Sequence, residues 1–422
     1  MFDQLKNRNA LKKLSDDAMA QISEIFDRIE RVAEANQWRV LNSFKHHRIS
    51  DAHLNGTTGY GYDDFGREAL EAVYADVFGT EAGLVRPQMV SGTHAITIAL
   101  FGVLRPGDEL LYVSGAPYDT LEEVIGLRPG GAGSLKEFGV SSRVIPLKDN
   151  QIDVDTVIQT VHEKTKMVAI QRSRGYSQRQ SLAIADIEQA VRRIKSTHPH
   201  VLIFVDNCYG EFVEDREPGH VGVDLMAGSL IKNPGAGLVP SGGYIVGRSD
   251  LVDLAAQRLT APGLGREVGP TYGALWAMYQ GLFLAPHITS QALKGAVFTA
   301  AVLENIGFKT DPLWSDPRTD LVQSVTFDDA DKMMAFCQAI QAMSPINSHV
   351  TPYPSPMPGY EDDVIMAAGT FVQGSSIELS ADGPIRPPYT AFIQGGLVYA
   401  HVKIAILTAI DRLIEKGWVS LP

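Results

Sequence analysis

Cysteine is almost missing from this chain, which has only Cys208 and Cys337 among its 422 residues. Two cysteines that lie far apart in the sequence support neither a disulfide framework nor a cysteine-rich metal site. The 11 histidines show no HExxH or comparable ligand spacing, so no metal site is expected.

Positive charge is also in short supply. Lysine and arginine number 37 against 49 aspartate and glutamate residues, which gives a formal net charge of −12. A negative field of this size opposes binding to nucleic acid or to an anionic membrane surface. We therefore expect neither as a partner.

Long apolar runs are missing too. The apolar segment from Tyr272 to Pro286 contains Gln280 and two glycines, and it is too short to span a bilayer. No signal peptide is visible after Met1, because charged residues interrupt any apolar core there. These features predict a cytoplasmic protein.

What is present predicts an α/β protein with more than one domain. The length exceeds that of one ordinary core, and β-rich segments alternate with helical ones from Phe65 to about Val246. Such alternation predicts a doubly wound, mostly parallel sheet. The strands are expected at 110–113, 142–147, 167–170, 201–205 and 243–247.

The remaining segments complete the expected organisation. Ser15, Asp16 and Asp17 predict the start of an amphipathic helix that runs to about Trp38. A strand at 321–327 and a helix at 329–343 indicate a smaller α+β domain. We expect a helical arm (1–60), a large α/β domain (61–270), an interdomain helical segment (271–307) and a small C-terminal domain (308–422).

The first candidate site residues are a carboxylate and an amine. An uninterrupted apolar run, Val201–Val205, predicts a strand buried on both faces, and Asp206 stands at its carboxyl end, where open α/β sheets bind ligands. Lys232 stands between a short apolar run and a glycine-rich turn, where a partly dry pocket can free its amine for nucleophilic attack. Such a pair suggests pyridoxal phosphate (PLP), although a turn-capping aspartate and a surface lysine also fit.

A second group of residues suits an anion and a flat ring. Ser91, Gly92 and Thr93 open an apolar helix, and backbone N–H groups at such a start form an anion site, although a simple helix cap fits as well. Ser229 adds a hydroxyl to the turn that carries Lys232. Tyr118 could stack on a heteroaromatic cofactor or simply pack in the core.

This ordered set resembles the fold-type I PLP-dependent enzymes of cysteine and methionine metabolism, the cystathionine lyase and methionine γ-lyase group. Within that group the chain is most similar to the methionine γ-lyase-like, or aluminium-resistance, branch. The resemblance runs from about Gly59 to the C-terminus and is carried by these strings: Tyr60–Tyr62 with Arg67, Glu137–Val140, Ile203–Asn207, Ser229–Lys232 and Glu378–Arg386.

The resemblance implies a role for each candidate. Lys232 would bind the cofactor covalently and shuttle protons, and Asp206 would keep the ring nitrogen protonated. Tyr118 would stack on the ring and assist a leaving group. The phosphate would be held by Ser91, Gly92, Thr93 and Ser229, and from the neighbouring subunit by Tyr60 or Tyr62 with Arg67. A homodimer or homotetramer with shared active sites is therefore expected.

The chain also departs from the family pattern. Residues 172–180 replace the family's Ser-Pro-Thr-Asn-Pro string, so the partner of the cofactor's phenolic oxygen is open among Arg179, Gln178 and Tyr176. Tyr176 is also a candidate for substrate binding. Glu378 occupies the place of the usual carboxylate-binding arginine, and Arg386 could replace that arginine or be a surface turn residue.

The function implied is that of a PLP-dependent carbon–sulfur lyase. Its substrate would be a sulfur-containing amino acid similar to cystathionine, cysteine or methionine, cleaved by β- or γ-elimination. Asp119 and Thr120 after Tyr118 differ from the residues typical of methionine γ-lyases, which argues against methionine. An aminotransferase or another fold-type I enzyme, or a PLP-binding stress-related protein with little turnover, are the alternatives.

Overall fold

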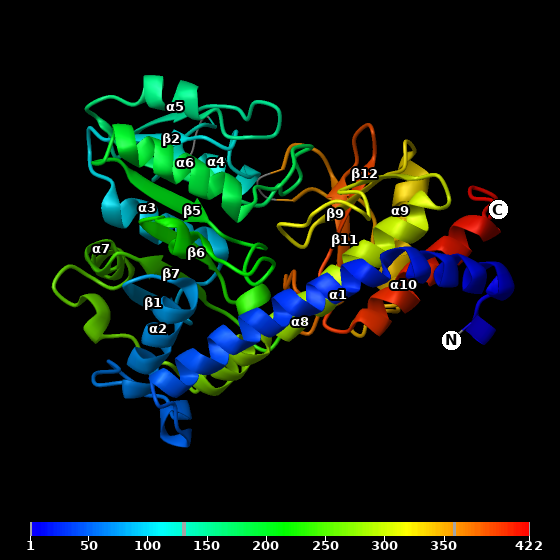
Figure 1. Ribbon diagram of the computed structural model, residues 1–422, viewed down its shortest axis with the longest axis horizontal. Helices are drawn as coiled ribbons and strands as arrows, with labels where there is room; N and C mark the ends of the chain where they lie inside the picture. Colours follow the sequence, from blue (N-terminus) through cyan, green and yellow to red (C-terminus); the bar gives the residue numbers. More distant parts are fainter. Residues whose placement is uncertain (1, 129–131, 358–359, 422) are drawn as a thin grey trace. The chain divides into compact units, whose positions relative to one another are not determined.

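The computed structural model describes residues 2–128, 132–357 and 360–421. These residues form two compact units: a central unit, Ala35–Leu284, and a terminal unit, Met1–Glu34 with Ala285–Pro422. The unit boundaries fall inside two long helices, α1 (Arg8–His46) and α8 (Leu275–Glu304) (Figure 1). They differ from the domain boundaries expected near residues 60, 270 and 307, because a continuous helical pattern gives no turn signal where packing changes.

The central unit contains a mostly parallel sheet. Within the described residues it has seven strands in the order β1-β7-β6-β5-β4-β2-β3, and β7 runs antiparallel to both of its neighbours. The strands are β1 (Ala82–Arg86), β2 (Glu109–Tyr112), β3 (Ser141–Val144), β4 (Thr165–Gln171), β5 (Leu202–Asp206), β6 (Leu225–Ser229) and β7 (Gly243–Gly247). The predicted α/β class with a mostly parallel sheet is confirmed.

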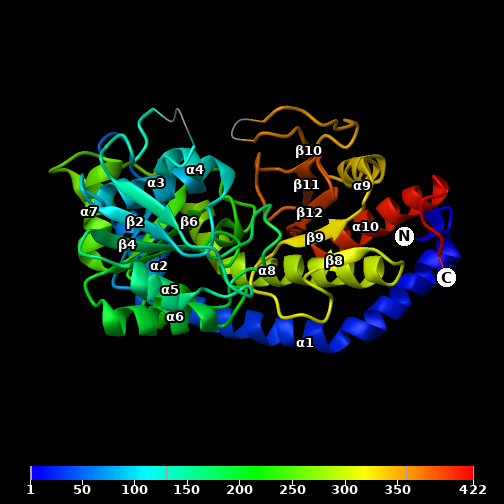
Figure 2. The ribbon, with the colours of Figure 1, turned by 90° about the horizontal axis from the view of Figure 1, so that it is seen from above.

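Helices cover both faces of this sheet, as a doubly wound fold requires. Figure 2 shows α3, α4 and α7 on one face and α5 and α6 on the other. The helices of the central unit are α2 (Phe65–Phe78), α3 (Gly92–Val103), α4 (Asp119–Ile125), α5 (Val154–Thr160), α6 (Ile184–Thr197) and α7 (Ser249–Leu259). Since β4, β5 and β6 are parallel, their carboxyl ends meet at one edge of the sheet.

The terminal unit is built around a smaller antiparallel sheet. Its described residues form five strands in the order β10-β11-β12-β9-β8, packed against α9 (Ala330–Ala342) and α10 (Tyr399–Glu415). The strands are β8 (Lys309–Asp311), β9 (Gln323–Thr326), β10 (Val364–Ala367), β11 (Ser380–Pro384) and β12 (Thr390–Gln394). The expected strand at 321–327 and helix at 329–343 match β9 and α9. The prediction of a smaller domain that combines helices with a separate sheet is thus confirmed.

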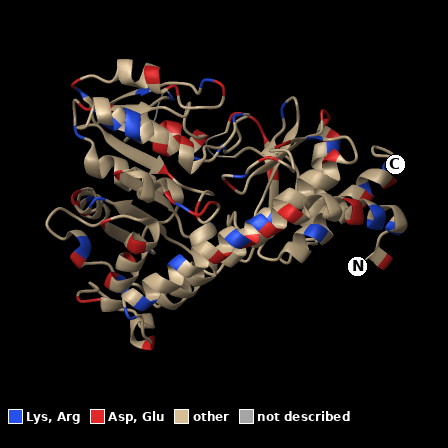
Figure 3. Ribbon diagram, in the orientation of Figure 1, with Lys and Arg blue, Asp and Glu red and all other residues tan. Residues whose placement is uncertain are grey.

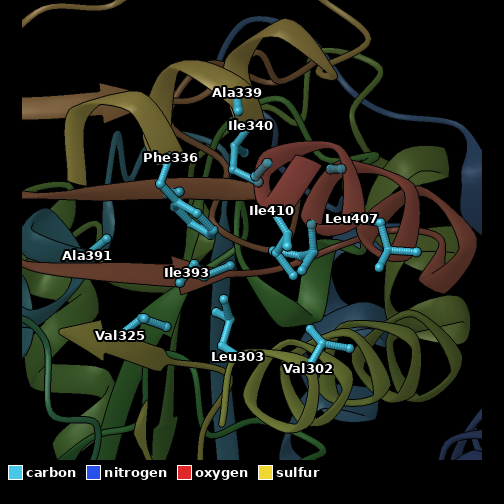
Figure 4. Packing of buried hydrophobic residues seen from close by; sticks show 14 of the residues in the cluster. Val302, Leu303, Val325, Phe336, Ala339, Ile340, Ala391, Ile393, Leu407 and Ile410 are labelled. Carbon is cyan, nitrogen blue, oxygen red and sulfur yellow. The ribbon is translucent and has the colours of Figure 1, made fainter. Parts of the chain in front are cut away.

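The core of the terminal unit forms between the sheet and these helices. Phe336 and Ile340 of α9 and Ile410 of α10 point toward Ile393 of β12 (Figure 4), and each of the four is at most 2% exposed. Burying a side chain of this size contributes about 1.5–3 kcal/mol. The apolar spacing of the two helices is therefore explained by this one shared core.

The start of α1 was predicted incorrectly. Ser15 lies inside the helix and is fully buried, and α1 begins at Arg8. The carboxylate of Asp411 in α10 accepts the backbone N–H groups of Lys6 (2.9 Å) and Asn7 (3.1 Å), just before that start. A residue about 400 positions away in the sequence thus satisfies donors near the helix start.

Charged residues of both signs alternate along α1 (Figure 3). Lys12 pairs with Asp16 at 2.6 Å and Lys13 with Asp17 at 2.8 Å, each one helical turn apart. Asp16 and Asp17 are therefore exposed partners of lysines rather than parts of a helix start. Within the described ranges, no helix combines the length and the apolar character needed to cross a membrane.

Candidate active site

Three of the predicted site residues, Asp206, Ser229 and Gly92, lie together at the carboxyl edge of the sheet. Gln171 at the end of β4 pairs in register with Asp206 at the end of β5, which pairs in register with Ala227 of β6. A methyl group added at Gly92, the first residue of α3, would lie 3.2 Å from Cβ of Ser229 and 3.3 Å from Sγ of Cys208. The start of α3 and the ends of β5 and β6 therefore meet at Gly92, where a larger side chain would be a tight fit.

Asp206 is a buried carboxylate, as the apolar run before it predicted. Its residue is 4% exposed, and Oδ1 accepts the backbone N–H of Cys208 at 3.1 Å. Burial raises the pKa of the Asp206 carboxyl, while the nearby charge of Lys232 opposes that rise. A buried carboxylate of this kind favours a cationic partner.

Lys232 follows the end of β6 and precedes a short 3₁₀ helix, Asn233–Gly235. Its Nζ lies 3.8 Å from the centroid of the Tyr209 ring. Burial lowers the pKa of the Lys232 amine, but the charges of Cys208, Tyr209 and Asp206 outweigh burial and raise it. The sequence predicted an amine that burial alone would discharge, whereas here the neighbouring groups favour its charged form, which must lose a proton before it can act as a nucleophile.

Tyr118 stands immediately before α4 and is tied to two other segments of the site. Its hydroxyl lies 2.6 Å from Oγ1 of Thr93 in the first turn of α3. Its backbone N–H donates to Oε1 of Gln171 at 2.8 Å. Burial raises the pKa of the Tyr118 phenol, so the phenol is neutral. Sequence reasoning missed Gln171, which places this tyrosine.

The predicted anion site has the geometry of a helix start. Ser91 caps α3, with its Oγ accepting the backbone N–H of His94 at 3.0 Å. Ser91 is therefore the N-cap of α3, as one of the two sequence interpretations held, and its contact with a phosphate stays a prediction. Gly92 and Thr93 supply the next backbone N–H groups, which have no acceptor inside their own helix. Ser229 is 1% exposed, and its Oγ accepts the backbone N–H of Ile231 at 3.3 Å.

Two arginines of the string at residues 172–180, Arg172 and Arg179, have different hydrogen-bond partners. Arg172 is fully buried, and its guanidinium donates to Glu214 Oε2 at 2.6 Å and to Asn207 Oδ1 at 2.9 Å. Arg179 donates to the carbonyl oxygens of Gln171 (2.8 Å) and Ser173 (2.5 Å). Both guanidinium groups thus hold the loop that follows β4.

The three candidates for the cofactor's phenolic oxygen differ in exposure. Gln178 is exposed, whereas Tyr176 and Arg179 are half-buried. Arg179 also acts electrostatically on Asp206. Burial raises the pKa of the Asp206 carboxyl, and the charges of Lys232 and Arg179 lower it. The assignment among the three, like the substrate role of Tyr176, stays a prediction.

The segment predicted to reach a neighbouring subunit has an exposed tip and a buried root. Tyr60 is 74% exposed and Tyr62 is 54% exposed, and their rings stack with centroids 5.6 Å apart. Arg67 is only 1% exposed; its guanidinium donates to the carbonyl oxygens of Gly61 (2.7 Å) and Gly269 (2.9 Å). Arg67 thus anchors the two tyrosines in its own chain.

The two candidates from the terminal unit differ in burial. Glu378 is 3% exposed, and its carboxylate accepts the backbone N–H groups of Phe371 (2.8 Å) and Val372 (2.9 Å). The acidic residue at the family's arginine position therefore anchors a local loop. Arg386 is largely exposed and pairs with Asp362 at 2.9 Å. Its role as a carboxylate clamp stays a prediction.

Sequence reasoning also missed the turn that follows Asp206. Glu211 is fully buried, and its Oε1 accepts the hydroxyl of Tyr244 at 2.7 Å. Burial raises the pKa of Glu211 to about 8, and the charge of Lys232 opposes that rise. In the sequence, Tyr209 and Glu211 lie within a few residues of Asp206 at the end of a strand, and this closeness could have marked them as candidates for the site.

The site combines an anionic group, an amine, an aromatic ring and a helix start. A family model described as methionine gamma-lyase matches residues 11–414. The chain belongs to the methionine gamma-lyase family. The family resemblance predicted from the sequence is confirmed.

Two relatives align with nearly the full length of this chain. The Bacillus subtilis (strain 168) protein named Uncharacterized protein YnbB is 60% identical over 418 residues, 99% of each chain. A carbon-sulfur lyase involved in aluminium resistance from Clostridium novyi NT is 48% identical, with a TM-score of 0.93 over 97% of this chain and 96% of its own.

A more distant likeness bears on the fold of the family. The pyridoxal-5'-phosphate dependent protein YhfS from Escherichia coli has a TM-score of 0.61 at 18% identity, over 91% of this chain and 97% of its own. At that identity the likeness shows the fold alone. This chain therefore has the architecture of fold-type I PLP-dependent enzymes.

Proposed function

We propose that this protein is a PLP-dependent carbon–sulfur lyase that acts on a sulfur-containing amino acid. The observation that carries the proposal is the convergence of Asp206, Lys232 and Gly92 at one edge of the sheet. A carboxylate, an amine and a helix start correspond to the ring nitrogen, the aldehyde and the phosphate of PLP. The donor set fits the cofactor on its chemistry, and Gly92 allows the helix start to pack closely against the ends of β5 and β6.

The residues that would hold the cofactor follow from this match. Lys232 would hold it covalently, and Asp206 would pair with its ring nitrogen. The backbone of Gly92 and Thr93 with the hydroxyl of Ser229 would hold its phosphate, and Tyr118 would cover its ring. When bound, the cofactor supplies an electron sink that acidifies the Cα–H bond of an amino acid.

The chain's own groups would then move the protons. The Lys232 amine, once neutral, accepts the proton from Cα of the substrate. The neutral phenol of Tyr118 is a proton donor for the sulfur atom that leaves from Cβ. For sulfur to leave from Cγ, the Lys232 amine would also have to remove a proton from Cβ. The C–S bond breaks, the sulfur leaves as a thiol, and an α-keto acid and ammonia are the final products after hydrolysis.

A direct assay tests this function. The protein, loaded with PLP, is incubated separately with cystathionine, cysteine and methionine, and both keto acid and thiol are measured. We expect keto acid together with thiol from cystathionine or cysteine, and none of either from Lys232→Ala. Keto acid that appears only with an added amino-group acceptor would instead identify an aminotransferase. Absence of turnover with intact cofactor binding would favour the low-turnover alternative.

We also propose that the active form is a dimer or a tetramer. The tip with Tyr60 and Tyr62 is held against the segment before α8, since Gly269 donates to the carbonyl oxygen of Tyr60 at 2.9 Å. Tyr272 (69% exposed) and Trp276 (63% exposed) lie on that segment and on α8. Exposed aromatic side chains on two bonded segments are typical of a protein interface, and a second copy of this chain would cover them.

A further inference from the structure

The turn between Asp206 and Glu217 has an unusual backbone. Tyr209 has a φ of +71° and Phe212 has a φ of +63°, both in the left-handed region. Large L-residues rarely adopt this conformation, and it persists only where surrounding contacts hold it. Such positions cluster where a protein must place a side chain in one orientation, which makes this turn a candidate for a role beyond packing.

The contacts that hold this turn come from the residue next to Lys232. The side-chain amide of Asn233 donates to the carbonyl oxygens of Tyr209 (3.2 Å) and Glu211 (2.9 Å). From the other side, Tyr244 donates to Glu211, and the carboxylate of Glu217 accepts the backbone N–H of Phe212 at 2.7 Å. The turn and the lysine are therefore tied together by adjacent residues, Lys232 and Asn233.

We propose that Tyr209 is a positioning residue whose ring face holds the charged amine of Lys232 whenever that amine is not bonded to a ligand. The Nζ atom lies 3.8 Å from the ring centroid, well within the range of a cation–π contact. A lysine side chain has several rotatable bonds, so a fixed contact for its end keeps the amine at one place. The role of Lys232 rests on the proposed function, but its contact with Tyr209 does not.

The contact also has an electrostatic consequence. A ring face stabilises the ammonium form and not the neutral amine, so it raises the pKa of Lys232. The other titratable groups that act on Lys232 come from the same turn, from the end of β5 and from the segment before α4: Cys208, Glu211, Asp206 and Tyr118. None of these is altered when Tyr209 alone is substituted.

The test measures the Lys232 amine in the full-length protein freed of cofactor. Brief acetylation at a series of pH values, followed by mass spectrometry of the peptide that contains Lys232, gives the pH midpoint of its reactivity. Tyr209→Asn removes the ring, and asparagine tolerates a left-handed backbone better than tyrosine does. We expect its midpoint to fall by about one pH unit, a tenfold change in the ratio of charged to neutral amine.

Two further variants keep the result interpretable. Tyr209→Phe retains the ring but loses the ionisable hydroxyl, so its midpoint should stay above that of the ringless variants, whereas Tyr209→Leu retains apolar bulk and should show the same fall as Tyr209→Asn. A change in access to solvent alters the rate at every pH but leaves the midpoint in place. An unchanged midpoint in the two ringless variants, or an equal fall in Tyr209→Phe, would overturn the proposal. Failure of the proposed lyase function would appear only in the keto acid assay.

Discussion

The hydroxyl of Tyr118 lies 2.6 Å from Oγ1 of Thr93, which joins the residue before α4 to the first turn of α3. The two side chains were predicted separately, one for the cofactor's ring and the other for its phosphate. Their contact means that the position of the tyrosine ring is coupled to the helix start that would bind the phosphate. Either side chain can therefore affect the placement of the other.

Removing only the hydroxyl of Tyr118 should separate catalysis from cofactor binding. Tyr118→Phe keeps the ring but loses the proton donor, so we expect kcat to fall by about 100-fold, the lower end for loss of an acid–base group. The affinity for PLP, measured by titration of its absorption band, should stay within about threefold, since the ring contact remains. A loss of cofactor binding equal to the loss of kcat would contradict this division of roles.

The negative charge of Asp206 should be needed for turnover. Asp206→Asn keeps the size of the side chain but removes the charge proposed to face the ring nitrogen, and kcat should fall by about 100-fold or more, as for a lost group in a preorganised site. The exposed Asp250→Asn serves as the matched control and should leave kcat unchanged. Wild-type rates in Asp206→Asn would remove this carboxylate from the mechanism.

Glu211 should make stability depend on pH. Its pKa is about 8 in the folded protein, against about 4.3 in an unfolded chain, so the folded state holds a proton that the unfolded state releases between these values. Its contribution is present below about pH 4.3 and is lost as the pH rises through 8, by an amount on the order of a few kcal/mol. Glu211→Gln carries no such proton and should gain stability relative to wild type over this range.

Urea unfolding at pH 5 and pH 8.5 measures this effect. The free energy of unfolding of Glu211→Gln, minus that of wild type, should be higher at the higher pH. The exposed Glu163→Gln should show the same difference at both pH values. The account of Glu211 fails if its own difference is also independent of pH.

Mixed dimers test whether one subunit completes the site of another. Lys232→Ala and the double variant Tyr60→Ala/Tyr62→Ala should each have little activity alone. Subunits mixed at random should regain about one quarter of the wild-type activity, because half of the dimers are hybrids with one intact site each. Mixing Lys232→Ala with Asp206→Asn should restore nothing, since both residues come from the same chain. Hybrids that form, as seen by native mass spectrometry, but stay inactive in the first mixture would contradict shared sites.

The sequence predicted the features that depend on short-range pattern. An apolar run ending in a carboxylate located β5 and Asp206, and the alternation of segments predicted a mostly parallel sheet. The strand β6 was missed because Leu225–Ser229 contains alanine and glycine, which are weak strand formers. Its place between β5 and β7 in the sheet buries it, and that place depends on residues distant in sequence.

Long-range contacts also explain the other differences. The start of α1 depends on Asp411, and the raised pKa of Glu211 depends on its burial beside Tyr244. Neither partner is close in sequence, so local patterns could not reveal them. The roles of Arg179, Tyr176 and Arg386 stay predictions, because they require a bound ligand or substrate.

The covalent attachment of the cofactor to Lys232 is the central claim. The most direct measurement is borohydride reduction of the PLP-loaded protein, followed by digestion and mass spectrometry of the peptides. We predict a pyridoxyl group on the peptide that contains Lys232 and none anywhere in Lys232→Ala. A pyridoxyl group on a different lysine, or its absence from wild-type protein that binds PLP, would contradict the account.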